Sequence, residues 1–172
     1  MGGFIWLADS SGNFLSDDVR DAGILHIASH GYFANTDPDN VGFVLSGGEQ
    51  AEGAFVTLTE LGAYQFGNRL VVVSGCETAM GAEAGGEGRL SVARAFLGQG
   101  AKHVVATLWP VDDRATAVFM DHFYTYLEDA NEIDGALQYA QQMMQRDRNF
   151  KDPFFWAGYV LHSVTLDQRI SL

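Results

Sequence analysis

Two side chains that can do nucleophilic chemistry follow two apolar stretches of this chain. Cys76, the only cysteine, comes just after the apolar run 70–73 (LVVV), and His30 lies near the end of the strand-like segment 23–31 (GILHIASHG). A thiolate is a strong nucleophile, and a neighbouring imidazole can hold or move its proton. In an α/β sheet, ligands bind at the carboxyl ends of the strands. The pair therefore indicates a candidate active site at that edge.

Cys76 also has a second interpretation, as a small buried apolar side chain without a chemical role. Its neighbours favour a strand exit over a strand interior, because Gly75 precedes it and the polar Glu77 and Thr78 follow it. A single cysteine cannot form an internal disulfide or a four-cysteine zinc site. The fold is therefore not expected to rely on an oxidising compartment.

His26 competes with His30 for the role of base, because alternate residues of a strand share a face. His26 lies deeper in the apolar segment, so we favour a hydrogen-bonded core histidine at this position. A zinc site made from His26, His30 and Cys76 is a further alternative, although no fourth ligand suggests itself. The remaining histidines have no evident partner in the sequence and are expected to be structural or exposed: His103, His122 and His162.

The composition limits the size of the fold and the class of partner. With 172 residues, 47% of them hydrophobic, the chain is long enough for one domain with a substantial core. Its net charge of −12 argues against nucleic acid or an anionic membrane as a partner, and permits a basic substrate. No apolar stretch has the length of a membrane span, and no secretory signal is evident at the amino terminus. We therefore expect a cytoplasmic protein.

Alternating strand and helix patterns predict an α/β fold. Strands are expected at 3–8, 23–29, 69–75, 102–109 and 155–163, a hairpin at 42–45 and 54–57, helices at 14–22, 58–64, 90–99 and 133–146, and a long helix from a cap at Asp112 or Asp113 to about 128. Such alternation implies a mostly parallel sheet with helices on both faces. Residues 31–40 and 79–88 are expected to be loops.

Four motifs, in order along the chain, resemble those of the CHAT domain family, a branch of the caspase-like cysteine peptidases related to caspases and separase. They are residues 29–31 (SHG), 74–78 (SGCET), 107–113 (TLWPVDD) and 153–159 (PFFWAGY). The histidine precedes the cysteine by 46 positions, close to the roughly 50 typical of caspases. The resemblance runs from about residue 14 to residue 163, nearly the whole chain.

The resemblance implies a cysteine endopeptidase with a caspase-like three-layer sandwich, an α/β fold whose mostly parallel sheet has helices on both faces. By this resemblance His30 is the catalytic histidine and Cys76 the nucleophile, and the backbone N–H groups of Gly31 and Cys76 form the oxyanion hole. No cofactor and no metal are expected. The chemistry agrees, because an ordinary thiol has a pKa of about 8.5 and needs a neighbouring imidazole to act efficiently near neutral pH.

Three acidic residues are candidates for a substrate-binding pocket. Asp112 and Asp113 follow the predicted strand 102–109, and Glu77 follows the nucleophile. A carboxylate at this edge would pair well with a lysine or arginine of the substrate. Asp112 or Asp113 has a competing role as the cap of the next helix, and the two roles can coexist.

The glycine-rich segment 81–88 superficially resembles a phosphate-binding loop. It lacks the Gly-Lys-Ser/Thr ending of a nucleotide loop, and Glu83 and Glu87 would repel phosphate. We expect instead a loop beside the active site that substrate or processing orders, with Arg89 or Arg94 pairing with an acid across it.

We expect residues 1–172 to form a single CHAT-like domain that lacks the strand–helix unit usual before the histidine strand, since only about 22 residues precede it. The family implies an upstream helical-repeat regulatory region in a longer protein. A missing unit would leave a strand edge open to a second copy, so a homodimer is a reasonable expectation.

The function that follows is cleavage of a protein or peptide substrate in a signalling or defence pathway. Two alternatives stay open: an inactive scaffold or regulatory domain that keeps the fold, and a small-molecule-binding α/β domain in which Cys76 is incidental.

Overall fold

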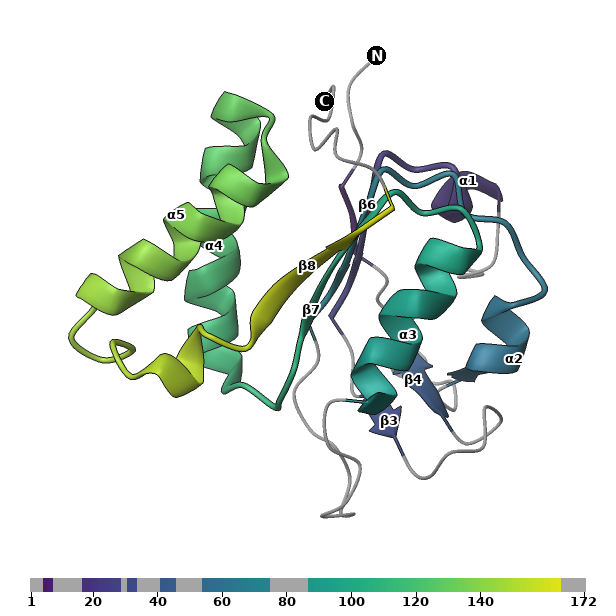
Figure 1. Ribbon diagram of the computed structural model, residues 1–172, viewed down its shortest axis with the longest axis horizontal. Coiled ribbons are helices and arrows are strands. Elements are labelled where there is room, and N and C mark those ends of the chain that lie inside the picture. Colours follow the sequence, from purple (N-terminus) through teal and green to yellow (C-terminus); the bar gives the residue numbers. More distant parts are fainter. Residues whose placement is uncertain are drawn as a thin grey trace, which may run out of the picture.

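A five-stranded sheet runs through the middle of the structure, a computed structural model that describes residues 5–7, 17–28, 31–33, 41–45, 54–74 and 87–164 (Figure 1). In spatial order its strands are β1 (Ile5–Leu7), β2 (Ile24–Ile27), β6 (Leu70–Val73), β7 (His103–Thr107) and β8 (Tyr159–Ser163). β1, β2, β6 and β7 are parallel to one another, and β8 pairs with β7 in the antiparallel direction. The predicted mostly parallel α/β sheet is therefore confirmed.

Helices cover both faces of this sheet (Figure 1). One face carries α4 (Asp113–Ala130) and α5 (Ile133–Arg146), and the other carries α1 (Asp17–Arg20), α2 (Leu58–Leu61) and α3 (Glu87–Gly98). Within the described ranges, no helix is both long enough and apolar enough to cross a bilayer. Because β2 and β6 face helices on both sides, successive residues enter two different cores, which explains their uninterrupted apolar sequences.

A second, smaller sheet lies next to α3. It consists of β3 (Gly31–Phe33), β4 (Val41–Leu45) and β5 (Ala54–Thr57), all antiparallel, in the order β3-β4-β5. Phe43 of β4 stacks on Phe96 of α3 with 6.4 Å between ring centroids, which ties this sheet to the α1–α3 side. The hairpin of β4 and β5 was predicted and is confirmed.

The prediction of a loop over residues 31–40 is wrong at its start, because residues 31–33 form β3. Three residues are too few to show an alternating pattern, and β4 supplies the hydrogen-bonding partner that makes them a strand. Residues 34–40 lie outside the described residues, as do 79–86 of the second predicted loop. Residues 87 and 88 of that loop instead begin α3.

Local sequence signals fix the ends of several helices. α2 begins with a capping box, in which the Thr57 hydroxyl accepts the Glu60 N–H at 3.0 Å and the Glu60 carboxylate accepts the Thr57 N–H at 2.8 Å. α5 has the predicted bounds. Beyond α3, Gly100 has φ +111°, and a Cβ there would lie 2.7 Å from the carbonyl oxygen of Phe66. Only glycine fits that position without strain.

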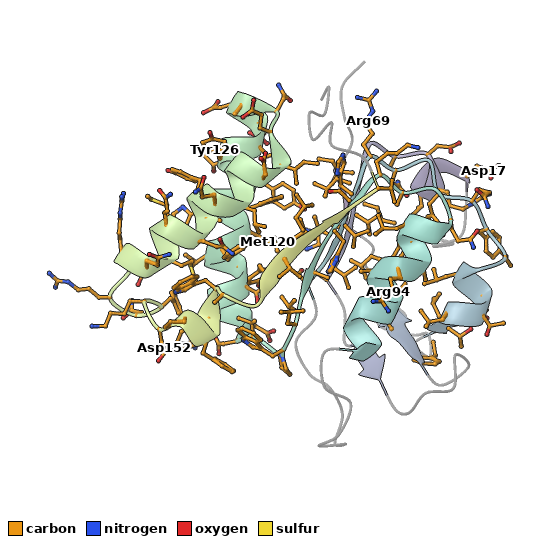
Figure 2. All side chains as sticks on the ribbon, in the orientation of Figure 1. Asp17, Arg69, Arg94, Met120, Tyr126 and Asp152 are labelled. Atoms are coloured by element: carbon orange, nitrogen blue, oxygen red, sulfur yellow. The ribbon has the colours of Figure 1, made fainter. Side chains whose placement is uncertain are left out.

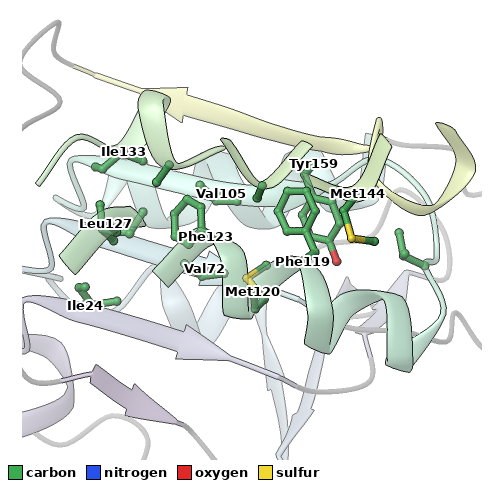
Figure 3. Packing of buried hydrophobic residues seen from close by; sticks show 14 of the residues in the cluster. Ile24, Val72, Val105, Phe119, Met120, Phe123, Leu127, Ile133, Met144 and Tyr159 are labelled. Carbon is green, nitrogen blue, oxygen red and sulfur yellow. The ribbon is translucent and has the colours of Figure 1, made fainter. Parts of the chain in front are cut away.

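An η2 turn (Pro153–Phe155) leads into β8, and the first residue of β8 enters the core beneath α4 and α5. The Tyr159 ring stacks on Phe119 of α4, with centroids 3.8 Å apart and planes 10° apart (Figure 3). Val105 of β7 and Met144 of α5 belong to the same cluster. This core joins the antiparallel edge of the sheet to both long helices.

Replacing Phe119 with alanine is expected to lower the free energy of unfolding by about 3–5 kcal/mol, because the side chain is fully buried and its removal leaves a cavity. Urea unfolding followed by circular dichroism measures the change. Thr125→Ala, on the exposed side of the same helix, is the control and should stay within about 0.5 kcal/mol of the parent. Equal effects of the two substitutions would contradict the packing described.

Candidate active site

The two strands that precede His30 and Cys76 are hydrogen-bonded neighbours. In the parallel pair β2–β6, Ile27 lies opposite Val73, and the N–H of Ser74 donates to the Ile27 carbonyl at 3.0 Å. His30 is the third residue after the end of β2, and Cys76 is the third residue after the end of β6. The two segments thus leave one edge of the sheet side by side, with equal lengths of chain before the two residues. His30 and Cys76 themselves, like Glu77, lie outside the described residues.

Gly31, the residue that follows His30, is the first residue of β3 and lies opposite Phe43 of β4. The backbone immediately after the histidine is therefore held by the second sheet. The chain leaves the main sheet at Ile27 and enters the second sheet at Gly31, four positions later.

Asp112 is the N-cap of α4. Its carboxylate accepts the N–H groups of Arg114 at 3.0 Å and of Ala115 at 3.1 Å, as the capping interpretation predicted. Asp113 lies in the first turn of the helix, and both acidic side chains are exposed. Because α4 follows β7, the neighbour of β6, both acids lie toward the edge where β2 and β6 end.

Two of the four sequence motifs pack against each other at this edge. The indole N–H of Trp109 donates to the carbonyl of Phe154 at 2.8 Å, and the two rings stack with centroids 6.4 Å apart. Gly158 lies against the Trp109 ring, where a Cβ would come within 2.8 Å of it, and the Gly158 carbonyl accepts the Leu108 N–H. Leu108 and Phe154 are both exposed, so this unit presents an apolar surface near the ends of β6 and β7.

A buried polar network links β2, β6 and α4 behind the same edge. The ring nitrogen Nε2 of His26 lies 2.5 Å from the Ser74 hydroxyl, and Nδ1 lies 2.9 Å from the Tyr124 hydroxyl. His26 and Ser74 are both buried. Burial lowers the pKa of His26 to about 4 and raises the pKa of Tyr124, so the ring is neutral and the phenol keeps its proton at neutral pH.

The network decides between the alternatives for His26. Both ring nitrogens are occupied by hydroxyl groups, which leaves neither for a zinc ion or for the proton of a thiol. The expectation of a hydrogen-bonded core histidine is confirmed. Among the described residues, no three histidine, cysteine or acidic side chains gather as metal ligands would.

Sequence reasoning missed Ser74 and Tyr124 as partners of His26. A signal was available for Ser74, a polar residue directly after the apolar run of β6. Tyr124 gave none, because it is separated from His26 by 98 positions and no local pattern links a tyrosine in α4 to a histidine in β2.

The remaining expected site residues lie on α3 or elsewhere in the sheet. Arg94 lies on the exposed side of α3 (Figure 2), and Arg89 lies in the first turn of the same helix. The loop across which one of them was expected to pair with an acid lies outside the described residues up to residue 86. His103 is buried and bonds the Ser163 hydroxyl through Nδ1 at 2.8 Å, a structural role as expected. His122 packs edge-on against Tyr139 between α4 and α5.

Neutral His26 is expected to make the stability depend on pH. Its pKa of about 4 in the folded protein lies below the unfolded value of 6.5, so the unfolded chain takes up the proton first. Neutral His26 contributes about 3 kcal/mol to the free energy of unfolding. This contribution is complete above about pH 6.5 and is lost as the pH falls toward 4. Urea unfolding of the parent and of His26→Asn at several pH values measures this. Carboxylates titrate alike in both proteins, so parallel pH curves would contradict the assignment.

The capping role of Asp112 has its own test. Asp112→Ala is expected to destabilise the fold by about 1 kcal/mol, whereas Asp112→Asn, which can still accept the same N–H groups, costs much less. Asp113→Ala serves as the matched control, because that carboxylate is one position further and is not the cap. Thermal unfolding compares the three variants. An Asp112→Asn loss as large as that of Asp112→Ala would show that charge, rather than capping, stabilises the helix.

Known proteins resemble this chain over different parts of its length. The sequence is 34% identical over 93 residues to tetratricopeptide repeat protein 28 of Mus musculus, and 33% identical over 91 residues to the Homo sapiens protein of the same name. These matches cover 54% and 53% of this chain but only 4% of each relative, so the chain corresponds to a small part of those proteins. The CHAT domain family matches residues 8–163, which include both exits from the sheet and the packed pair of motifs. The chain belongs to the CHAT domain family.

Proposed function

We propose that this domain is a cysteine endopeptidase in which Cys76 attacks a peptide carbonyl and His30 handles the proton. The observation that carries the proposal is the pairing of β2 with β6, since both segments leave one edge and reach the two residues after equal lengths of chain. Membership of the CHAT domain family supports the same two residues. The engagement of both His26 nitrogens removes the competing base.

The reaction follows the usual course for a thiol nucleophile. The Cys76 thiolate adds to the carbonyl carbon, and the resulting oxyanion accepts hydrogen bonds from the N–H groups of Gly31 and Cys76. The C–N bond then breaks as His30 donates a proton to the departing amine, which leaves an acyl-enzyme. Water, deprotonated by His30, hydrolyses the thioester and restores the thiol. Gly31 is the first residue of β3 and pairs with Phe43 of β4, and a backbone held in this way supports the proposed role of its N–H group.

The fold proposed for this chemistry is the caspase-like three-layer sandwich. Its support is the largely parallel sheet with α1–α3 on one face and α4 and α5 on the other. Parallel α/β sheets bind ligands at the carboxyl ends of their strands, which is the edge where β2 and β6 end.

The substrate is proposed to carry a lysine or arginine before the cleaved bond. The exposed Asp112 and Asp113 at the start of α4, together with Glu77, would receive it, and the net charge of −12 favours a basic partner. The capping bonds of Asp112 leave room for this second role, because a carboxylate accepts more than two hydrogen bonds.

We further propose that residues 1–172 act as one CHAT domain within a longer cytoplasmic protein with helical repeats, and that the domain pairs with a second copy. The names of the two relatives, tetratricopeptide repeat proteins, support the repeat region. Such a region would regulate access to the site in a signalling or defence pathway.

The test is covalent labelling by peptides that end in an acyloxymethyl ketone. Because Cys76 is the only cysteine, mass spectrometry of the adduct reports that residue alone. The parent should be labelled faster by a peptide with arginine next to the ketone than by one with leucine. His30→Ala should slow labelling by about a hundredfold or more, since a general acid–base group contributes about 10²–10⁴ to such rates.

His122→Ala is the matched control, a histidine on α4 that contacts Tyr139 instead of the strand ends. It should be labelled at the rate of the parent, and Cys76→Ser should not be labelled. Equal rates for His30→Ala and His122→Ala would refute the dyad and favour an inactive scaffold. Faster labelling by the leucine peptide would refute the acidic pocket and leave the Cys76–His30 dyad untouched.

A further inference from the structure

We propose that the hydrogen-bonded chain Tyr124–His26–Ser74 is a positioning device that holds the β6 exit in the orientation Cys76 needs, an inference that rests on the function proposed above. Ser74 is the first residue after β6 and stands two positions before Cys76. His26 lies in β2, four positions before His30. The network thus crosses between the two segments that lead to the proposed dyad, just before they reach it.

The three groups come from three separate elements. His26 projects from β2, Ser74 follows β6 and Tyr124 belongs to α4, so the two hydrogen bonds connect the sheet to the helix that covers it. The His26 and Tyr124 rings also contact each other, with centroids 5.6 Å apart. On the backbone, the Ser74 N–H is bonded to the Ile27 carbonyl. Ser74 is therefore fixed both through its main chain and through its side chain.

Such double anchoring exceeds what packing at this point requires. A valine or alanine in place of Ser74 would continue the apolar core beneath α4, to which Val72 belongs two positions earlier. A hydroxyl here adds direction, because a hydrogen bond has a preferred distance and angle, whereas apolar attraction is non-directional. The exit of the strand is where such a restriction would matter for the residues that follow.

The chemistry of the three groups also sets the direction of the bonds. A neutral imidazole donates from one nitrogen and accepts at the other. The heavy-atom positions fit two arrangements of donors and acceptors. We assign the one in which the Tyr124 phenol donates to Nδ1 of His26 and the Nε2–H group of His26 donates to the Ser74 hydroxyl. A phenol is the stronger acid and better donor, and an aliphatic hydroxyl oxygen is the better acceptor. In this direction Ser74 keeps its own hydrogen for a further acceptor.

The same sheet contains a matched comparison. His103 of β7 and Ser163 of β8 form another histidine–hydroxyl pair, with 2.8 Å between Nδ1 and Oγ. His103 is the first residue of β7, so this pair lies at the amino end of that strand, away from the carboxyl ends of β2 and β6. Removing either hydroxyl deletes one bond to an imidazole, but only the Ser74 pair adjoins the proposed site.

The experiment measures the rate at which Cys76 reacts with the arginine ketone peptide and, separately, with iodoacetamide, in the parent and in variants. Ser74→Ala should slow the peptide reaction by about tenfold to a hundredfold, the scale expected when a reacting group is misplaced. Ser163→Ala should leave the rate within about twofold of the parent. Ser74→Thr, which keeps the hydroxyl, should recover most of the rate, a result that a loss of general stability would not produce.

Three outcomes overturn the inference: equal rates for Ser74→Ala and Ser163→Ala, no recovery in Ser74→Thr, or a loss of rate that simply tracks stability across all variants. Should Ser74→Ala fail to fold, Tyr124→Phe removes the far end of the chain while keeping the ring, and the same comparison with Ser163→Ala applies. If peptide labelling of the parent does not depend on His30, the endopeptidase proposal fails, and the iodoacetamide rates still decide whether Ser74 positions Cys76.

Discussion

The parallel pairing of β2 with β6 is the constraint on which the rest of the structure depends. Opposite positions Ile27 and Val73 end the two strands together, and the Ser74 N–H continues the pairing one step further. A slip of one residue would turn every side chain of β6 to the other face, exchanging the α3 core for the α4 core. Because both faces are filled with apolar side chains, that slip is strongly disfavoured. The register of the exits is therefore set by the cores on either side.

The polar groups that interrupt these cores lie near the strand ends, where directional hydrogen bonds add to the apolar packing and fix how the chain leaves the sheet. Tyr124, His26 and Ser74 join α4 to both strands near their carboxyl ends, and Asp112 fixes the start of α4 close by. The Trp109 indole ties the segment after β7 to the one before β8. All of these contacts gather toward one edge of the sheet. A site formed by segments that follow the strands needs a rigid scaffold, and these contacts supply one.

Periodicity and capping residues predicted most of the elements from the sequence. α5 has the expected bounds, because a stripe of apolar residues is a local signal. The expected helix start at Leu58 is confirmed for a similar reason, since the Thr57 hydroxyl lies three positions before Glu60. The strand β3 was missed because three residues carry no pattern and depend on pairing with β4. Long-range contacts were missed for the same reason, since nothing local in the sequence joins Tyr124 to His26.

For the site, sequence motifs named the residues and the fold supplies the arrangement of the strands that lead to them. The measurement that tests the account most directly is the distance between the Cys76 sulfur and the nearest ring nitrogen of His30 in a crystal structure of the full chain. The account predicts about 3–4 Å, within reach of a hydrogen bond or slightly longer in an empty site. A sulfur and a ring on opposite faces of the sheet, or separated by packed core side chains, would contradict it.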